Sequence, residues 1–235
     1  MSSLCAVCGA VVKPEFKAPA AELAPDLDFR PGEPARSTLR RWVAECSGCG
    51  AAAPNLTALT EVDAAVVRND SEYAALRTQA PAFARNFLLW GLLSQRRGDV
   101  WPAAEALLQA AWAADDAEAP DWAQTWRLQA ADLWPGSREV QPRLCLIDIV
   151  RRAGDFQRAA AVAEALGEEA IDENSAAIVD FQRRLIAERE TGRQLMSSAL
   201  RPRAARPHVS YARASSGTRN SGGLGGFWRR LFGRD

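Results

Sequence analysis

Residues 91–112 read GLLSQRRGDVWPAAEALLQAAW and show the periodicity that dominates most of this chain. Apolar residues recur at helical spacing on both sides of Arg97-Gly98-Asp99-Val100. Glycine reaches the left-handed conformation that ends a helix, and aspartate can cap the next helix by accepting its free N–H groups. The stretch therefore predicts a hairpin of two helices, over residues 82–97 and 99–114.

Helical periodicity extends from Thr57 to about Leu195, and a second joint, Ala153-Gly154-Asp155-Phe156, repeats the first. Thr60-Glu61-Val62-Asp63 resembles a capping box at the start of this region. Further helices are predicted over 120–134, 138–153, 155–167 and 172–195. Joints of two to five residues imply antiparallel packing of neighbouring helices.

The first hairpin is similar to one tetratricopeptide repeat. The packing positions of that repeat are matched by Gly91, Gly98, Ala103, Leu107 and Ala110. The second hairpin keeps only part of the pattern, at Gly154, Phe156 and Ala159. The two joint glycines are 56 residues apart, which excludes a regular array of 34-residue repeats.

Four of the five cysteines form two Cys-x-x-Cys-Gly units, Cys5 to Gly9 and Cys46 to Gly50. In a chain without an export signal, such pairs indicate a metal site and not disulfides. Four thiolates favour one tetrahedral zinc ion, with iron or a redox dithiol as alternatives. Because four protein ligands leave no open position, we expect a structural metal. The segment Thr38–Glu45 is predicted to enter the second pair as a strand.

The remaining candidate groups favour structural roles. Cys145 lies in an apolar helix and is expected to be a small core residue. The pairs Asp115-Asp116 and Glu168-Glu169 are expected to be solvated charges at helix ends. The helical region is rich in tryptophan, and core packing is favoured over an aromatic groove for Trp90, Trp101, Trp112, Trp122, Trp126 and Trp134.

Charge divides the chain at Thr191. Residues 192–235 hold nine of the 29 basic residues and one of the 29 acidic residues, so the body is acidic by eight and the tail is basic by eight. Residues 196–226 are predicted to be a disordered linker rich in Arg, Ser and Gly. The last residues, 227–235, are predicted to be a short amphipathic tail that docks weakly on a membrane surface or a protein groove, through Phe227, Trp228, Arg229, Arg230, Leu231 and Phe232.

The predicted fold is mainly α. An N-terminal zinc ribbon with short β-strands and a long insert (1–56) precedes an antiparallel, tetratricopeptide-like helical-hairpin domain (57–195), and the linker and tail follow. No signal peptide and no apolar segment of about 20 residues are found, so we expect a cytoplasmic protein.

Several motifs together resemble a bacterial family of unknown function that joins a Cys-x-x-Cys zinc ribbon to tetratricopeptide-like helices. Apart from the cysteine units, the resemblance depends on Asp26-Leu27-Asp28-Phe29-Arg30, Trp42, Gly98-Asp99, Ala110-Ala111-Trp112, Asp115-Asp116 and Arg152 to Phe156. It covers residues 4–190 and implies this architecture without an activity. Ala51 departs from the aromatic residue expected after the second unit.

The sequence favours a non-catalytic adaptor that binds a protein partner through its helical surface. The single histidine, His208, lies in the predicted linker, and no nucleotide-binding glycine motif occurs, which disfavours an enzyme. The alternative is a zinc-ribbon protein that binds nucleic acid through its basic tail. The acidic body would repel phosphate, so this alternative is weaker.

Overall fold

The structure is a computed structural model that describes residues 3–134 and 136–200. The described residues all lie in one compact unit. The predictions for the later part of the linker, for His208 and for the tail residues Phe227–Phe232 concern residues outside the described part.

The described part is mainly helical, with short strands near its N-terminus, as the sequence predicts. Two antiparallel strand pairs carry the cysteine units, β1 (Ser3–Leu4) with β2 (Val11–Val12) and β3 (Ala44–Glu45) with β4 (Ala52–Ala53). A 3-10 helix, η1 (Arg36–Arg41), precedes β3. The α-helices are α1 (Glu61–Asn69), α2 (Ser71–Gln79), α3 (Arg85–Arg97), α4 (Val100–Asp116), α5 (Pro120–Leu133), α6 (Val140–Arg152), α7 (Phe156–Gly167), α8 (Glu173–Ala187) and α9 (Met196–Ala199).

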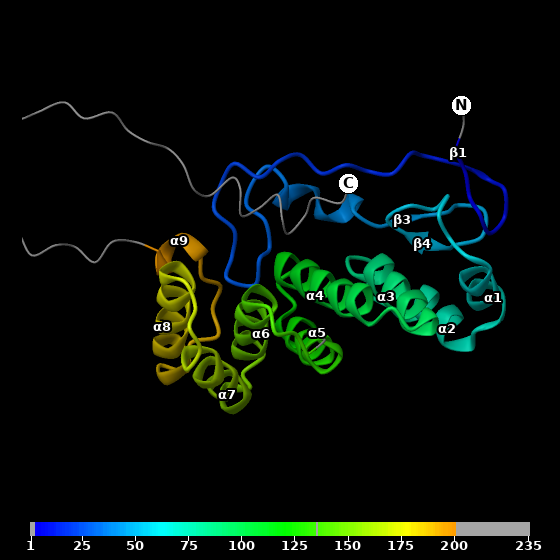
Figure 1. Ribbon diagram of the computed structural model, residues 1–235. Helices are drawn as coiled ribbons and strands as arrows, with labels where there is room; N and C mark the ends of the chain where they lie inside the picture. Colours follow the sequence, from blue (N-terminus) through cyan, green and yellow to red (C-terminus); the bar gives the residue numbers. More distant parts are fainter. Residues whose placement is uncertain (1–2, 135, 201–235) are drawn as a thin grey trace, which may run out of the picture. The chain divides into compact units, whose positions relative to one another are not determined.

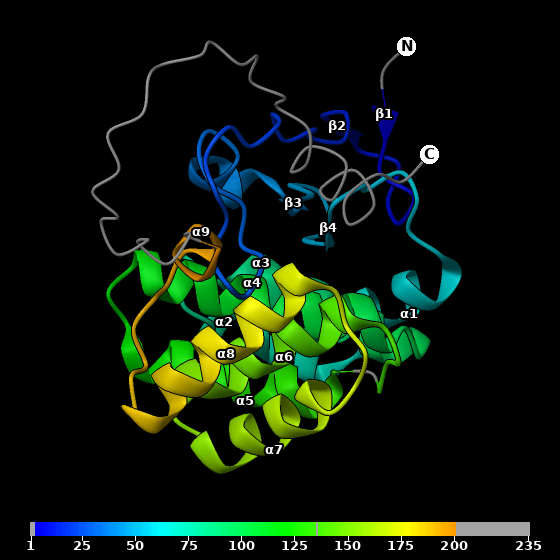
Figure 2. The same ribbon diagram turned by 60° about the vertical axis from the view of Figure 1, so that its left-hand side comes forward.

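Within this unit, the strand pairs lie near α1, α2 and α3, and the later helices follow in chain order (Figure 1). The insert between the two cysteine units runs beside the helices as far as α6 and returns through η1 to β3 (Figures 1 and 2). An isolated bridge between Asp26 and Leu195 ties the far end of this insert to the segment before α9. The insert therefore reaches both ends of the helical layer.

The predicted helix joints form, with one exception in their capping. Gly98 and Gly154 both adopt φ of 80°, in the left-handed region. Asp155 caps α7 by accepting from the Arg158 N–H, as expected. Asp99 makes no such cap, because its carboxylate instead accepts from Arg97 Nε at 2.8 Å. At α1 the capping box is complete, with Thr60 and Asp63 bonding each other's backbone N–H.

Three sequence-based boundaries differ from the structure by more than three residues. Residues 36–41 form η1 and only Ala44–Glu45 are strand, because Thr38 Oγ1 donates to Ala35 O and Trp42 Nε1 donates to Thr38 Oγ1, which closes a local turn. Helix α8 ends at Ala187 and not at 195, since the backbone reverses at Arg189 with φ of 53°. The predicted linker begins at 196, whereas Met196–Ala199 form a helical turn.

The core explains most, but not all, of the tryptophans. Trp112 and Trp126 are buried at 5% and 3% exposure, as predicted, whereas Trp122 is 47% exposed. Cys145 is a buried core residue, as expected, and burial raises the pKa of its thiol well above the usual range. Gly91 lies where α3 meets α4, and a Cβ there would lie 3.4 Å from Ala106 Cβ, at van der Waals contact, so an alanine would also fit at this position.

Candidate metal centre and buried charge network

The two cysteine units adopt the same backbone geometry. In the first, Cys5 N–H donates to Ala10 O and Gly9 N–H donates to Cys5 O, both at 2.8 Å. In the second, the corresponding bonds join Cys46 with Ala51 and Gly50, also at 2.8 Å. Gly9 and Gly50 have φ of 74° and 75°, a conformation that side chains disfavour. Each strand pair thus presents two sulfurs from one tight turn.

The four sulfurs converge. Cys5 Sγ lies 3.8 Å from Cys49 Sγ, and Cys8 Sγ lies 3.6 Å from Cys46 Sγ. All four ligand atoms lie within 4.8 Å of one another. A tetrahedron with Zn–S distances of ~2.3 Å has edges of about 3.8 Å, so the spacing of these sulfurs fits one tetrahedral ion. The cluster could therefore hold one metal ion.

The thiols of the cluster differ in acidity. Burial opposes ionisation of Cys46, but the backbone N–H groups of Cys49 and Gly48 donate to its sulfur and lower its pKa to about 7. Burial raises the pKa of Cys49 to about 12. A divalent cation bound among these sulfurs would favour their thiolate forms, so metal binding is expected to release protons.

Helix α2 supplies the aromatic residue that the second unit lacks. Ala51 is fully buried, and Tyr73 packs nearby with 0% exposure. The Tyr73 hydroxyl donates to Gly50 O at 3.0 Å and accepts from Ala52 N–H at 3.1 Å. An aromatic side chain from another part of the chain therefore packs against this unit.

Other helices hold the rest of the centre. Arg68 of α1 donates to Val7 O at 2.8 Å, inside the first unit. Asn86 of α3 donates to Val43 O at 3.1 Å, just before β3. The cysteine cluster is thus fastened to α1, α2 and α3 and is part of the compact unit.

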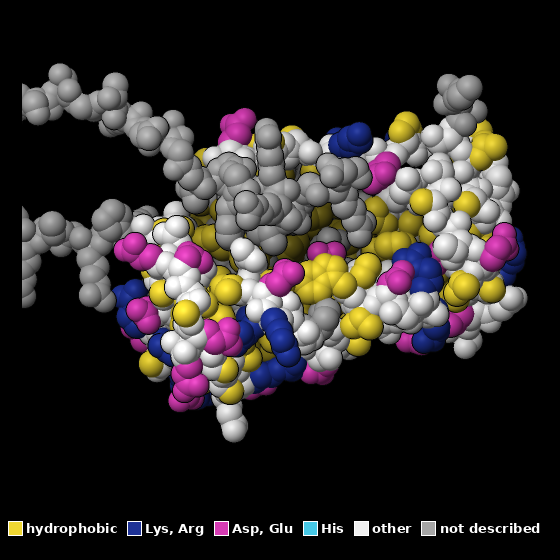
Figure 3. Space-filling view, in the orientation of Figure 1, with side chains coloured by type: hydrophobic (Ala, Val, Ile, Leu, Met, Phe, Trp, Pro, Cys, Tyr) yellow, Lys and Arg dark blue, Asp and Glu magenta, His cyan; other side chains and the backbone are white. Residues whose placement is uncertain are grey.

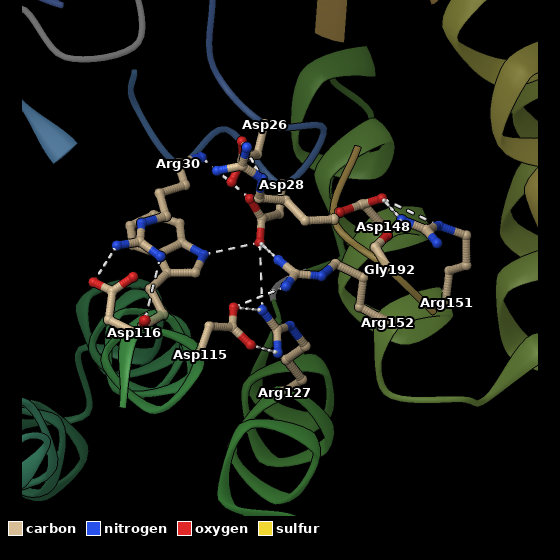
Figure 4. Close-up of polar contacts among 12 residues, drawn as sticks. Asp26, Asp28, Arg30, Asp115, Asp116, Arg127, Asp148, Arg151, Arg152 and Gly192 are labelled. Carbon is tan, nitrogen blue, oxygen red and sulfur yellow. Dashed lines mark hydrogen bonds and ion pairs between the residues drawn. The ribbon is translucent and has the colours of Figure 1, made fainter. Parts of the chain in front are cut away.

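A second cluster, which the sequence analysis did not predict, surrounds Asp28 (Figure 4). Asp28 is fully buried, and its Oδ2 accepts from Trp112 Nε1 at 2.8 Å and from Arg152 at 3.0 Å. Its Oδ1 accepts from the Arg30 N–H, and its backbone carbonyl accepts from Cys145 Sγ. Burial opposes the charge of Asp28, but Arg152, Arg127 and the Trp112 N–H hold its pKa below the usual value.

Asp115 and Asp116 both belong to this charge network. The prediction of a solvated charge is wrong for Asp115, whereas Asp116 is exposed as predicted but also pairs with Arg30. Asp115 accepts from Arg127 at 2.5 Å and from Arg152 at 2.8 Å, with its side chain 25% exposed. Asp116 accepts from Arg30, whose side chain is 1% exposed, at 2.5 Å. Arginines that sequence alone would place on the surface are buried here because each one has a carboxylate partner.

The network continues to the C-terminal end of the unit. Asp26 accepts from Arg36 at 2.8 Å, yet burial and the neighbouring Asp28 raise the pKa of Asp26. Arg151 pairs with Asp148 and donates to the backbone carbonyls of Glu190 and Gly192. The loop 26–30 is therefore bonded to helices α4, α5 and α6 as well as to the segment after α8.

The sequence contained one signal for this network. Residues 26–30, together with Trp112, Asp115-Asp116 and Arg152, carry much of the resemblance to the ribbon-and-helix family, and the structure brings them together.

An open cleft of about 620 Å³ borders the network. Three arginines and three acidic residues are among its lining: Arg36, Arg152, Arg193, Asp115, Asp116 and Glu118. With balanced charges, this cleft favours neither an anion nor a cation.

Comparisons with protein-family models, with curated proteins and with solved structures find no match to this chain. The cysteine cluster and the helical domain that the resemblance implies are both present. Among the helices of the described part, none is long and apolar enough to cross a membrane.

Proposed function

We propose that the chain is a non-catalytic, zinc-dependent scaffold that binds another protein through its helical surface. The observation that carries the proposal is the set of four cysteine sulfurs at tetrahedral spacing, fastened to α1, α2 and α3. A site with four thiolate ligands has no position for a reacting water, so its zinc would be structural.

The rest of the described chain supports a binding role. The buried ionisable groups that we identified pair with one another: Asp28 and Asp115 with Arg127 and Arg152, and Arg30 with Asp116. Catalytic groups would instead converge on a substrate cleft with partners left for the substrate. Helical hairpins offer extended surfaces for proteins without chemistry of their own.

We also propose a repeat type for the hairpins, a related family and a cellular location. The hairpins α3–α4 and α6–α7, with their left-handed glycine joints, are proposed to be tetratricopeptide-like, and the chain to be related to the bacterial ribbon-and-helix family. We place the protein in the cytoplasm, where reduced thiols are maintained.

Elemental analysis of the purified full chain tests the metal. We expect one zinc per chain, and Cys46→Ala should lose both the zinc and stability. Cys145→Ala is the matched control, because this thiol is buried outside the cluster, and it should retain the zinc. A wild-type protein without stoichiometric metal would overturn the proposal, and iron in place of zinc would correct it.

Crosslinking and affinity purification from cells that produce the protein test the scaffold role. A protein partner should remain bound after nuclease treatment. If every partner is lost when nucleic acid is digested, the protein-binding function is wrong and the nucleic-acid alternative takes its place.

A further inference from the structure

A groove of about 430 Å³ lies between η1, the start of α3 and the end of α4. Its lining consists of Arg40, Ala82, Phe83, Asn86, Phe87 and Ala117. Phe87 is buried at 2% exposure, and Phe83 is partly exposed. Figure 3 shows hydrophobic side chains on the face of the molecule between the strand pair β3–β4 and the helices. The volume is within the range of sites that bind small groups or a few side chains.

The walls of this groove are held in place by named contacts. At one end of η1, Arg36 pairs with Asp26, and after its other end Trp42 packs edge-on against Trp112 with ring centroids 6.3 Å apart. The Asn86 amide donates to Val43 O, three residues before Cys46. A groove with fixed walls loses less entropy when a ligand binds than a surface that must first be ordered.

Charge at the rim is one-sided. Among the described residues, no hydrogen bond or ion pair engages the exposed guanidinium of Arg40. The described lining contains no carboxylate. Arg41, next in sequence, differs: its guanidinium lies over the Phe16 ring, 4.0 Å from the centroid. A carboxylate on a bound segment would therefore find one free cation at this rim.

Aromatic surface continues from the groove. Phe83 packs against Trp126 with ring centroids 6.1 Å apart, and Trp126 stacks on Trp122 at 5.1 Å. Trp122 is 47% exposed. Exposed aromatic side chains beside a pocket are typical anchors at protein interfaces.

We propose that this groove docks a segment of a partner protein that carries large apolar side chains next to a carboxylate. The apolar side chains cover Phe83 and Phe87, and the carboxylate pairs with Arg40. The inference rests on the proposed scaffold function and names its binding site and the chemistry of its partner. Because the groove takes only a few side chains, the dissociation constant of the segment is expected to be on the order of 10–100 µM.

The probe is a fluorescein-labelled peptide that alternates phenylalanine and leucine with glutamate, and binding to the full chain is measured by fluorescence polarisation. Arg40→Glu should weaken binding about fivefold to tenfold, since it replaces attraction by repulsion at a partly solvated rim. Arg41→Glu is the matched control with the same change in net charge, and its affinity should change less than about twofold. A peptide with lysine in place of glutamate should bind the Arg40→Glu protein more tightly than the wild type.

Ala82→Trp tests the groove itself. Ala82 is exposed, so a larger side chain there fills the groove without entering the core, and it should abolish binding. The far-UV circular dichroism of each variant is compared with that of the wild type. Absence of probe binding to the wild type, or equal effects of Arg40→Glu and Arg41→Glu, would overturn the proposal. Binding to full-length Trp228→Ala but not to the wild type would also overturn it, because the natural occupant would then be part of this chain.

A photo-crosslinking amino acid separates this inference from the proposed function. It is placed at Ala82 in the groove or at Ala165, an exposed alanine of α7. Partner proteins crosslinked from position 165 but not from position 82 would leave the scaffold in place and refute the groove. Failure at both positions, with no partner retained in the affinity purification, would refute the scaffold as well.

Discussion

Asp28→Asn should destabilise the protein more than any other single change in the charge network. The substitution keeps the shape of the side chain and removes one negative charge from a fully buried site. Trp112 Nε1 can still donate to the Asn oxygen, but Arg152 and Arg127 then share only Asp115. The new amide also places N–H donors among guanidinium groups, so two cations become undercompensated.

The magnitude follows from burial. Removing one partner of a buried ion pair costs about 3–5 kcal/mol. The free energy of unfolding of a typical domain is about 5–15 kcal/mol, so this loss is a large share of it. At roughly 2–4 °C per kcal/mol for a chain of this size, the midpoint of thermal unfolding should fall by about 10 °C. Asp116→Asn should cost less, about 1 kcal/mol, because Asp116 is 46% exposed and the Asn oxygen can still accept from the buried Arg30.

Urea unfolding followed by far-UV circular dichroism at neutral pH measures both free energies. A double-mutant cycle with Arg152→Gln should give a coupling of about 1–3 kcal/mol between positions 28 and 152. The reasoning is refuted if Asp28→Asn and Asp116→Asn cost the same within about 0.5 kcal/mol, or if the cycle shows no coupling.

Three further predictions concern pH, packing and metal. The pKa of Asp28 in the folded protein is below its usual value, so the ionised Asp28 stabilises the fold at a pH above that usual value, and this stabilisation is lost as the pH falls through the folded pKa. The difference in unfolding free energy between wild type and Asp28→Asn should therefore stay constant from neutral pH to about pH 5 and narrow below pH 4. A difference that widens below pH 4 would contradict this prediction. Tyr73→Phe leaves Gly50 O and Ala52 N–H without their partner, so it should lower the free energy of unfolding by about 1–3 kcal/mol and speed the loss of zinc to a colorimetric chelator. Trp122→Ala, at an exposed site, should do neither. Equal rates of zinc loss for the two variants would refute the role of the Tyr73 hydroxyl. Removing the metal with a chelator should lower the unfolding temperature and weaken binding of the acidic peptide to the groove, and added zinc should restore both. Unchanged peptide affinity in the metal-free protein would show that the metal centre does not hold η1 in place.

Local signals in the sequence were enough for helices α3 to α8 and for the cysteine units, whereas α2 (Ser71–Gln79) was not predicted. The capping box at Thr60, the glycine joint at Gly154 and the spacing of Cys46 and Cys49 each depend on a few neighbouring residues. Such features form without help from residues distant in the sequence. For the same reason, the proposed ligand set could be written from spacing alone.

Contacts distant in sequence explain what could not be predicted. Asp28 meets Trp112 across 84 residues and Arg152 across 124, and nothing local in the sequence gives these pairings. Asp115 resembled a solvated helix end for that reason. Similarly, Tyr73 replaces an aromatic residue expected at position 51, because a packing requirement can be met from any element that comes near.

The buried charge network is expected to contribute something other than net stability, because burying paired charges adds little to the free energy of unfolding. Replacing a buried ion pair by apolar residues of similar volume is often neutral or stabilising by about 1–4 kcal/mol. The network does, however, fix where the insert lies: a hydrophobic loop could slide along α4 and α6, whereas Asp28 fits only where Trp112 and Arg152 both reach it. The same loop leads through Arg36 into η1 and then to Cys46, so its register sets the groove and the second cysteine unit.

If the network positions the insert, replacing it by apolar residues should affect binding more than stability. A variant with Asp28→Leu, Asp115→Leu, Arg127→Met and Arg152→Met should keep an unfolding free energy within about 2 kcal/mol of the wild type, because no charge is left unpaired. It should nevertheless bind the acidic peptide more weakly, and amide hydrogen exchange in residues 26–45 should be faster than in the wild type. If stability, peptide affinity and exchange all match the wild type, the network has no role in positioning. If the unfolding free energy falls as far as it does for Asp28→Asn, the ion pairs themselves stabilise the fold and the positioning argument is wrong.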